Sequence, residues 1–124
     1  MTEKRDSEQP ENEIELTTDY ANNTLFEPTI WDLKLIFGEF SQRSKSIEYH
    51  TSITVPWAQA KLIMYYLQAN VAVHESETGT IKIPKAVWPQ EWVPPAEQAA
   101  KDPKNKQLYE RLKKLRTELL EGSG

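Results

Sequence analysis

Apolar and polar residues alternate along two neighbouring stretches, residues 31–40 and 46–55. In the first stretch Trp31, Leu33, Leu35 and Phe37 share one face, opposite Asp32, Lys34 and Ile36. In the second, Ile47, Tyr49, Thr51, Ile53 and Val55 share one face, opposite Glu48, His50, Ser52 and Thr54. A period of two predicts strands, and the short polar loop between them predicts an antiparallel hairpin with one wet face. We expect an edge strand before the hairpin, at residues 24–30, because Pro28 cannot donate to a ladder.

The period of two in the apolar pattern ends at Pro56, and proline is favoured at the first position of a helix. A helix is expected from Pro56 to Ser76, with Gly79 as its stop signal. At 100° per residue it carries two apolar faces separated by two narrow polar seams. The first face is bulky and is expected to pack on the Trp31, Leu33 and Leu35 side of the hairpin. Its members are Ala60, Ile63, Met64, Leu67, Val71 and His74.

The second helix face is the candidate for self-association. It holds Ala58, Leu62, Tyr65, Tyr66, Ala69, Ala72, Val73 and Ser76. Six of these, from Ala58 to Ser76, are spaced 4, 3, 4, 3 and 4, which is a heptad-like seam that lets another helix approach closely. Either the chain's own C-terminal helix or a second copy can cover it. We favour a homodimer or higher oligomer, since a core of about sixty residues is marginal alone.

The C-terminal third contains three pieces. Residues 80–84 have the pattern of one more short strand, and residues 85–101 form a linker rich in Pro and Trp. A helix is expected over residues 102–121, with Asp102 as its N-cap and Pro103 in its first turn. Its leucine stripe and the two linker tryptophans are the candidate docking residues of this tail: Trp88, Trp92, Leu108, Leu112, Leu115 and Leu119. The tryptophans either anchor the tail on its own domain or are offered to another protein.

These elements predict an α+β fold: a small antiparallel sheet of two to three strands, one long helix, a Pro/Trp-rich extended segment and a C-terminal helix. Residues 1–19 are expected to be a disordered acidic tail, because they cannot bury enough apolar area to offset ordering. The core domain is expected at residues 20–84, and residues 122–124 are interpreted as a possible cloning remnant.

Four motifs together resemble a family of short bacterial proteins that is catalogued as a domain of unknown function. They are YANN at residues 20–23, WDLKLIFGEF at 31–40, HTSITVPWAQAKLIMYYLQANVAVHE at 50–75 and GTIKIP at 79–84. The resemblance implies a strand–strand–helix domain in the bacterial cytoplasm. It implies no activity and no catalytic residue.

Composition narrows the possible functions. The absence of Cys excludes disulfides and Cys-ligated metal sites, and the net charge of −4 makes nucleic acid an unlikely partner. The N-terminus has no apolar stretch of a signal peptide, and the longest apolar run, within residues 62–73, is too short to span a bilayer. We therefore expect a cytoplasmic protein that does not enter the membrane. Residues 1–19 hold seven acidic side chains and residues 101–121 hold seven basic ones.

Candidate catalytic chemistry is sparse. His50 is expected to be solvated on the wet strand face, and His74 to pack on the bulky helix face. Two histidines make a poor metal set, and the chain has no Gly-rich phosphate loop. Lys61 near the helix start is read as a lysine flanking the core. We expect no catalytic residue, no metal, no cofactor and no enzymatic activity.

The sequence favours a non-catalytic protein–protein interaction or adaptor module that self-associates through the long helix. An alternative is a chaperone-like binder of extended polypeptide, on analogy with small sheets followed by a long apolar helix. Nucleic-acid binding through the basic C-terminal helix is a weaker alternative, because acidic residues are interspersed there.

Overall fold

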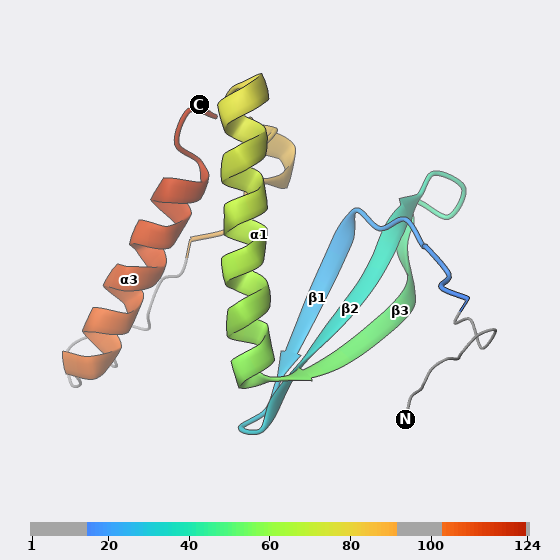
Figure 1. Ribbon diagram of the computed structural model, residues 1–124, viewed down its shortest axis with the longest axis horizontal. Coiled ribbons are helices and arrows are strands. Elements are labelled where there is room, and N and C mark those ends of the chain that lie inside the picture. The colour runs from blue at the N-terminus through green and yellow to red at the C-terminus, as the bar shows by residue number, and fades with distance from the viewer. Residues whose placement is uncertain (1–14, 92–102, 124) are drawn as a thin grey trace, which may run out of the picture. The chain divides into compact units, whose positions relative to one another are not determined.

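The computed structural model describes residues 15–91 and 103–123. It is an α+β protein whose three-stranded antiparallel sheet is followed by a long helix, a later segment and a C-terminal helix (Figure 1). The chain divides into two units, Met1–Met64 and Tyr65–Gly124, and each is described by itself.

The first unit contains the sheet, with strand order β1-β2-β3. The strands are β1, Asn23–Pro28; β2, Asp32–Ser41; and β3, Ser46–Pro56. β1 is an edge strand, as its proline predicted. The polar loop after Ser41 turns the chain with Lys45 at a φ of 57°, and the backbone N–H of Lys45 donates to the Ser41 carbonyl at 2.8 Å. The predicted hairpin is therefore confirmed.

Trp31 does not begin β2, as its alternation with Leu33 suggested, but lies in the turn that joins β1 to β2. The cause is the hydroxyl of Thr29, which accepts the backbone N–H groups of Trp31 and Asp32 at 3.1 and 3.0 Å. A threonine hydroxyl that binds backbone groups two and three residues ahead favours a turn over an extended strand. As a result the Trp31 side chain is 77% exposed.

A β-bulge interrupts the pairing of β2 with β3. Phe37 pairs with Thr51 and Gly38 pairs with Tyr49, so His50 is an extra residue on β3. Directly opposed residues of an antiparallel pair share a face. The bulge therefore places Ile47 and Tyr49 on the opposite face from Thr51, Ile53 and Val55.

The single wet face predicted for the hairpin is consequently wrong. One face carries Phe26, Leu33, Leu35, Phe37, Thr51, Ile53 and Val55, and it also receives Glu48. The other face carries Leu25, Ile36, Phe40, Ile47 and Tyr49, together with Ser52 and Thr54. Each face thus mixes apolar and polar residues, because one extra residue in a strand reverses the alternation beyond it.

Gly38 is the residue that makes the bulge possible. A Cβ atom there would lie 2.5 Å from the Glu48 carbonyl oxygen and 2.8 Å from Cα of Tyr49. Gly38 is buried, and the Tyr49 ring covers the space that a side chain would fill, since its Cδ1 atom lies 2.9 Å from the same point. A glycine inside a strand often marks such a close backbone approach.

The long helix α1, Trp57–Thr78, begins directly after β3. Its predicted limits, Pro56 and Ser76, differ by one or two residues from those observed. The indole N–H of Trp57 donates to the carbonyl oxygen of Thr29 at 2.9 Å, which fixes the first turn to the β1–β2 turn. At the other end Gly79 has a φ of 99° and its N–H donates to the Glu75 carbonyl at 2.9 Å, which is the expected glycine stop.

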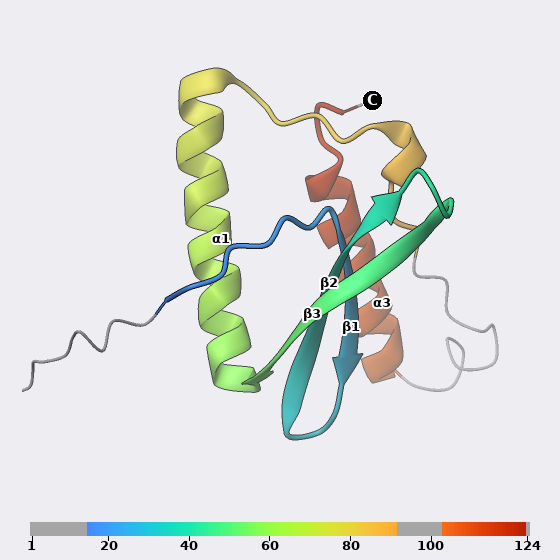
Figure 2. The same ribbon diagram turned by 90° about the vertical axis from the view of Figure 1, so that its right-hand side faces the viewer.

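The rest of the second unit starts with an extended segment that leads to the 3-10 turn η2, Lys85–Val87 (Figure 2). The strand expected at residues 80–84 does not form, and η2 gives the predicted linker a short piece of regular structure. The last helix, α3, spans Pro103–Leu119, slightly shorter than predicted. Asp102, its predicted N-cap, lies outside the described residues, as do residues 1–14 of the expected acidic tail.

Residues 122 and 123 contact the rest of the second unit, in contrast to their interpretation as a possible cloning remnant. The hydroxyl of Ser123 accepts the backbone N–H of Ile83 at 2.9 Å. Gly122 has a φ of 82°, and a Cβ atom there would lie 3.1 Å from the Thr80 side chain. These residues therefore join the end of the chain to the segment that follows α1.

Candidate functional site

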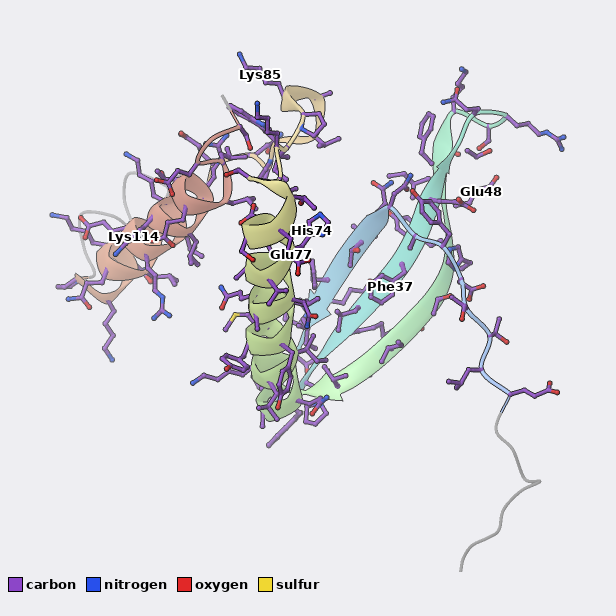
Figure 3. All side chains as sticks on the ribbon, turned by 45° about the horizontal axis from the view of Figure 1, so that its top comes forward. Phe37, Glu48, His74, Glu77, Lys85 and Lys114 are labelled. Carbon is purple, nitrogen blue, oxygen red and sulfur yellow. The ribbon has the colours of Figure 1, made fainter. Side chains whose placement is uncertain are left out.

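The main candidate surface is the second apolar face of α1. Figure 3 shows side chains projecting from both sides of this helix. No residue of α1 is buried. On the predicted self-association face Leu62 is 50% exposed and Tyr65 is 62% exposed, while Ala69 is partly buried. Ala58, Tyr66, Ala72, Val73 and Ser76 are exposed as well. Most of the predicted self-association face is therefore exposed in the described residues.

Two local contacts shape this face. The rings of Tyr65 and Tyr66 meet edge to face, with their centroids 5.3 Å apart and an interplanar angle of 70°. This geometry suits the ring quadrupoles and holds the Tyr65 ring along the helix. Near the C-terminal end, the Ser76 hydroxyl donates to the Val73 carbonyl at 2.7 Å. Its hydrogen is directed onto its own helix, so Ser76 adds a small side chain rather than a free donor to the face.

The polar seam beside this face carries opposite charges at its two ends. Lys61 and Gln68 are exposed, and Glu75 is half-buried. The Oε2 atom of Glu75 accepts the backbone N–H of Ile81 at 2.8 Å, which fixes the carboxylate near the end of the helix. The seam thus presents a lysine, an amide and an oriented carboxylate at intervals of seven residues.

The first, bulky face of α1 is exposed too. Met64, Leu67 and Val71 each keep close to half or more of their surface open to solvent. His74, labelled in Figure 3, is also exposed, and its carbonyl accepts the hydroxyl of Thr78 at 2.9 Å. The ring of His74 was expected to pack on a bulky face, and its exposure contradicts that expectation.

The second candidate surface is the tail, where Arg116 holds the Pro/Trp segment to α3. Its Nε–H donates to the Pro89 carbonyl at 2.8 Å, and its Nη1 lies 3.8 Å from Oε2 of Glu91. The guanidinium carbon and the Lys85 ammonium each lie 5.9 Å from the centroid of the Trp88 ring, within the range of a cation–π contact. The indole N–H of Trp88 donates to the Ile83 carbonyl at 2.7 Å. Trp88 is therefore half-buried against its own chain.

The other predicted docking residues have different surroundings. Leu108, Leu115 and Leu119 are each about half exposed, and Leu112 is partly buried, so the leucine stripe of α3 stays open. Trp92 lies outside the described residues. Sequence reasoning did not single out Arg116. The sequence signal for this residue is an arginine among lysines, on a helix that follows a tryptophan-rich segment. Arg contacts aromatic faces more often than Lys does, and its planar group can donate to a carbonyl at the same time.

The third region is the bulge, which holds a cluster that the sequence did not predict. Nδ1 of His50 lies 2.7 Å from Oγ1 of Thr51, and its Nε2 lies 3.0 Å from the carbonyl oxygen of Tyr20. The Thr51 hydroxyl donates to Oδ2 of Asp19 at 3.1 Å. An open hollow of about 380 Å³ is lined by these side chains and by Thr17, Ala21 and Phe37. Gly38 was the sequence signal for the bulge, because a glycine inside a strand pattern suggests one.

The order of contacts in this cluster differs from that of a catalytic triad. In a triad the base lies between the hydroxyl and the carboxylate. Here the Thr51 hydroxyl lies between the ring of His50 and the carboxylate of Asp19, and the second ring nitrogen faces a backbone carbonyl. The arrangement joins residues 19 and 20 to β3. It ties part of the predicted acidic tail to the sheet.

Searches against protein-family models, curated proteins and solved structures found no match for this chain. Among the described residues, no group of three or more His, Cys, Asp and Glu side chains is placed to hold a metal ion. No helix within residues 15–91 and 103–123 has the length and hydropathy to cross a membrane.

Proposed function

We propose that this protein is a non-catalytic interaction and assembly module that self-associates through α1. The observation that carries the proposal is the scarcity of a core. Within residues 15–91 and 103–123, Val55 is the one hydrophobic side chain that is buried. Ordering each residue of a chain opposes folding by about 1–2 kcal/mol, and burial of apolar surface is the main offset. A second copy supplies the additional burial that these residues need.

The choice of α1 as the surface follows from its length and composition. It is a helix of 22 residues, and its apolar residues lie on both sides of the two polar seams. A helix that is apolar on more than one face is typical of one packed on several sides. Large exposed apolar surfaces on soluble proteins mark interaction sites. The exposed face with small residues is the one that allows the closest approach of a second helix.

A charge placed on each helix face tests the proposal. In solution the full chain should have twice its mass of 14.4 kDa, as measured by sedimentation equilibrium or light scattering. Ala69→Glu should shift the mass toward that of the monomer, because a carboxylate would be buried in the interface. Leu67→Glu, on the bulky face of the same helix, is the matched control and should leave the mass unchanged. A monomer mass for the unaltered chain at high concentration would refute the proposal.

A second candidate function is the capture of extended polypeptide by the sheet. It is favoured by Phe26 and Ile53, which are exposed on one face of the sheet, and by its two edge strands. An edge strand offers unpaired backbone groups to an extended peptide, and neighbouring apolar side chains add contacts. The isolated protein should then suppress aggregation of an unfolded client. Unchanged aggregation at a stoichiometric excess of the protein would exclude this function.

A further inference from the structure

Six residues of the self-association face of α1, those of the heptad-like seam, are symmetric in position but not in size. Ala58 and Ser76 both lie nine positions from residue 67, Leu62 and Ala72 lie five from it, and Tyr65 and Ala69 lie two from it. In the two inner pairs a large side chain is matched with an alanine. The spacing of 4, 3, 4, 3 and 4 reads the same in both directions along the helix.

From this symmetry we infer that two copies of α1 pair antiparallel across a two-fold axis at the level of residue 67. The inference rests on the proposed function and specifies its geometry. Tyr65 then faces Ala69 of the other copy, and Leu62 faces Ala72 of the other copy. Each of these central layers combines one large and one small side chain, so the helices can pack at one separation across them, and the outer layers pair Ala58 with Ser76.

A parallel pair lacks this complementarity. Identical residues would meet in each layer, with Tyr65 on Tyr65 and, one layer further, Ala69 on Ala69. The two tyrosine rings would hold the helices apart and leave a gap at the alanines. Gaps of this kind forfeit packing energy.

The charges beside the face support the same direction. Lys61 and Glu75 each lie seven positions from Gln68. At a rise of about 1.5 Å per residue, antiparallel pairing brings Lys61 of one copy within about 3 Å, along the axis, of Glu75 of the other. The two-fold axis repeats this ion pair, with Gln68 opposite Gln68 between them. In a parallel pair Lys61 would flank Tyr66 and Gln68 would flank Val73, so no opposite charges would meet.

The position of Glu75 suits this role. Its Oε2 atom already accepts the N–H of Ile81, so the carboxylate is oriented before any second copy binds. A carboxylate accepts several hydrogen bonds at its two oxygens, so it can bind the Lys61 ammonium as well. Preorganised groups lose less entropy on association.

Cysteine cross-linking distinguishes the two directions. The chain has no Cys, so introduced thiols are the only ones present. Ala58→Cys alone and Ser76→Cys alone should give no covalent dimer on oxidation, because like positions lie about 27 Å apart along an antiparallel pair. An equimolar mixture of the two variants should give a covalent dimer. A cross-link in either single variant would establish a parallel pair and overturn the inference.

Charge reversal tests the flanking contacts without a cross-link. Lys61→Glu should raise the dissociation constant of the dimer about tenfold, because two ion pairs are replaced by repulsion. The double variant Lys61→Glu with Glu75→Lys should restore affinity. Lys61→Glu combined with Glu77→Lys has the same net charge but changes a residue outside the flank, and it should not restore affinity.

The outcomes separate the inference from the proposed function. If the unaltered chain is a monomer, the proposed function itself fails. If it is a dimer and the mixed cysteine variants do not cross-link, or the double charge reversal restores nothing, only the antiparallel geometry fails. Circular dichroism of each variant confirms that the helix is retained.

Discussion

Nδ1 of His50 lies 2.7 Å from Oγ1 of Thr51, although successive side chains of a regular strand point to opposite faces. The contact forms because His50 is the extra residue of a bulge between Tyr49 and Thr51. The two side chains therefore lie side by side, where they bind Asp19 and the Tyr20 carbonyl. One inserted residue thus decides both the faces of the sheet and the attachment of the segment before β1.

Deleting His50 should leave the sheet intact. Tyr49 would then precede Thr51 directly, and their present positions on opposite faces are those that regular alternation requires. We expect a loss of about 1 kcal/mol in the free energy of unfolding, from the contacts of the ring. Urea denaturation followed by circular dichroism measures it. Deleting Thr54, a regularly paired residue, should lower the free energy of unfolding by at least about 2 kcal/mol more than deleting His50. The deletion shifts the register, so that Ile53 no longer pairs with Leu35. Equal losses would argue against the bulge.

Gly38→Ala should destabilise the sheet by about 2 kcal/mol or more, because the added methyl group collides with backbone atoms. The nearest atom, the Glu48 carbonyl oxygen, would lie only 2.5 Å away. The thermal unfolding midpoint reports the change. Removing the Tyr49 ring in the same protein should not rescue it, since the closest contacts are to the backbone. Rescue by Tyr49→Ala would show that the ring, rather than the backbone, excludes a side chain.

Trp57, in the first turn of α1, and Trp31, in the β1–β2 turn, should respond differently to the same substitution. Trp57→Phe removes the indole N–H that donates to the Thr29 carbonyl, and it should lower the free energy of unfolding by about 1 kcal/mol. Trp31→Phe is the control, because that side chain is 77% exposed, and its effect should stay within about 0.5 kcal/mol. Chemical denaturation of the two variants compares them. A larger effect at Trp31 would contradict this assignment.

Arg116→Lys should release the Pro/Trp segment nearly as much as Arg116→Ala does. Lysine keeps the charge but lacks the planar group that donates from Nε to Pro89 while it lies near the Trp88 ring. Hydrogen exchange of residues 83–91, measured by mass spectrometry, should be faster in both variants. Lys113→Ala on the same helix is the control and should leave the exchange unchanged. Retained protection in Arg116→Lys would mean that charge alone holds the segment.

Much of the fold could be predicted from local sequence pattern. The hairpin, the edge strand with Pro28, the start of α1 after Pro56 and its stop at Gly79 all follow from periods and backbone preferences of single residues. These features depend on neighbours along the chain, so the sequence carries them directly. The composition of both α1 faces was predictable for the same reason.

The candidate site was predictable only in part. The second face of α1 stays a prediction from the sequence, and none of its residues is buried in the structure. The sequence did not reveal the hydrogen bond from Arg116 to the Pro89 carbonyl. The two residues are 27 positions apart, and their contact depends on how the tail folds back. The residues next to Trp88 in the sequence do not indicate whether its side chain packs on its own chain or on a partner protein.

The sequence by itself determined which residues can form strands and helices, and it placed a palindromic spacing of apolar residues along α1. Only the tertiary structure decided which face of the sheet Ile47 and Tyr49 occupy. That choice depends on whether β3 pairs with β2 without an extra residue. The close approach of Gly38 to the Glu48 carbonyl allows the bulge, so β3 contains one extra residue. Strand periodicity is local, whereas register is fixed by contacts between strands.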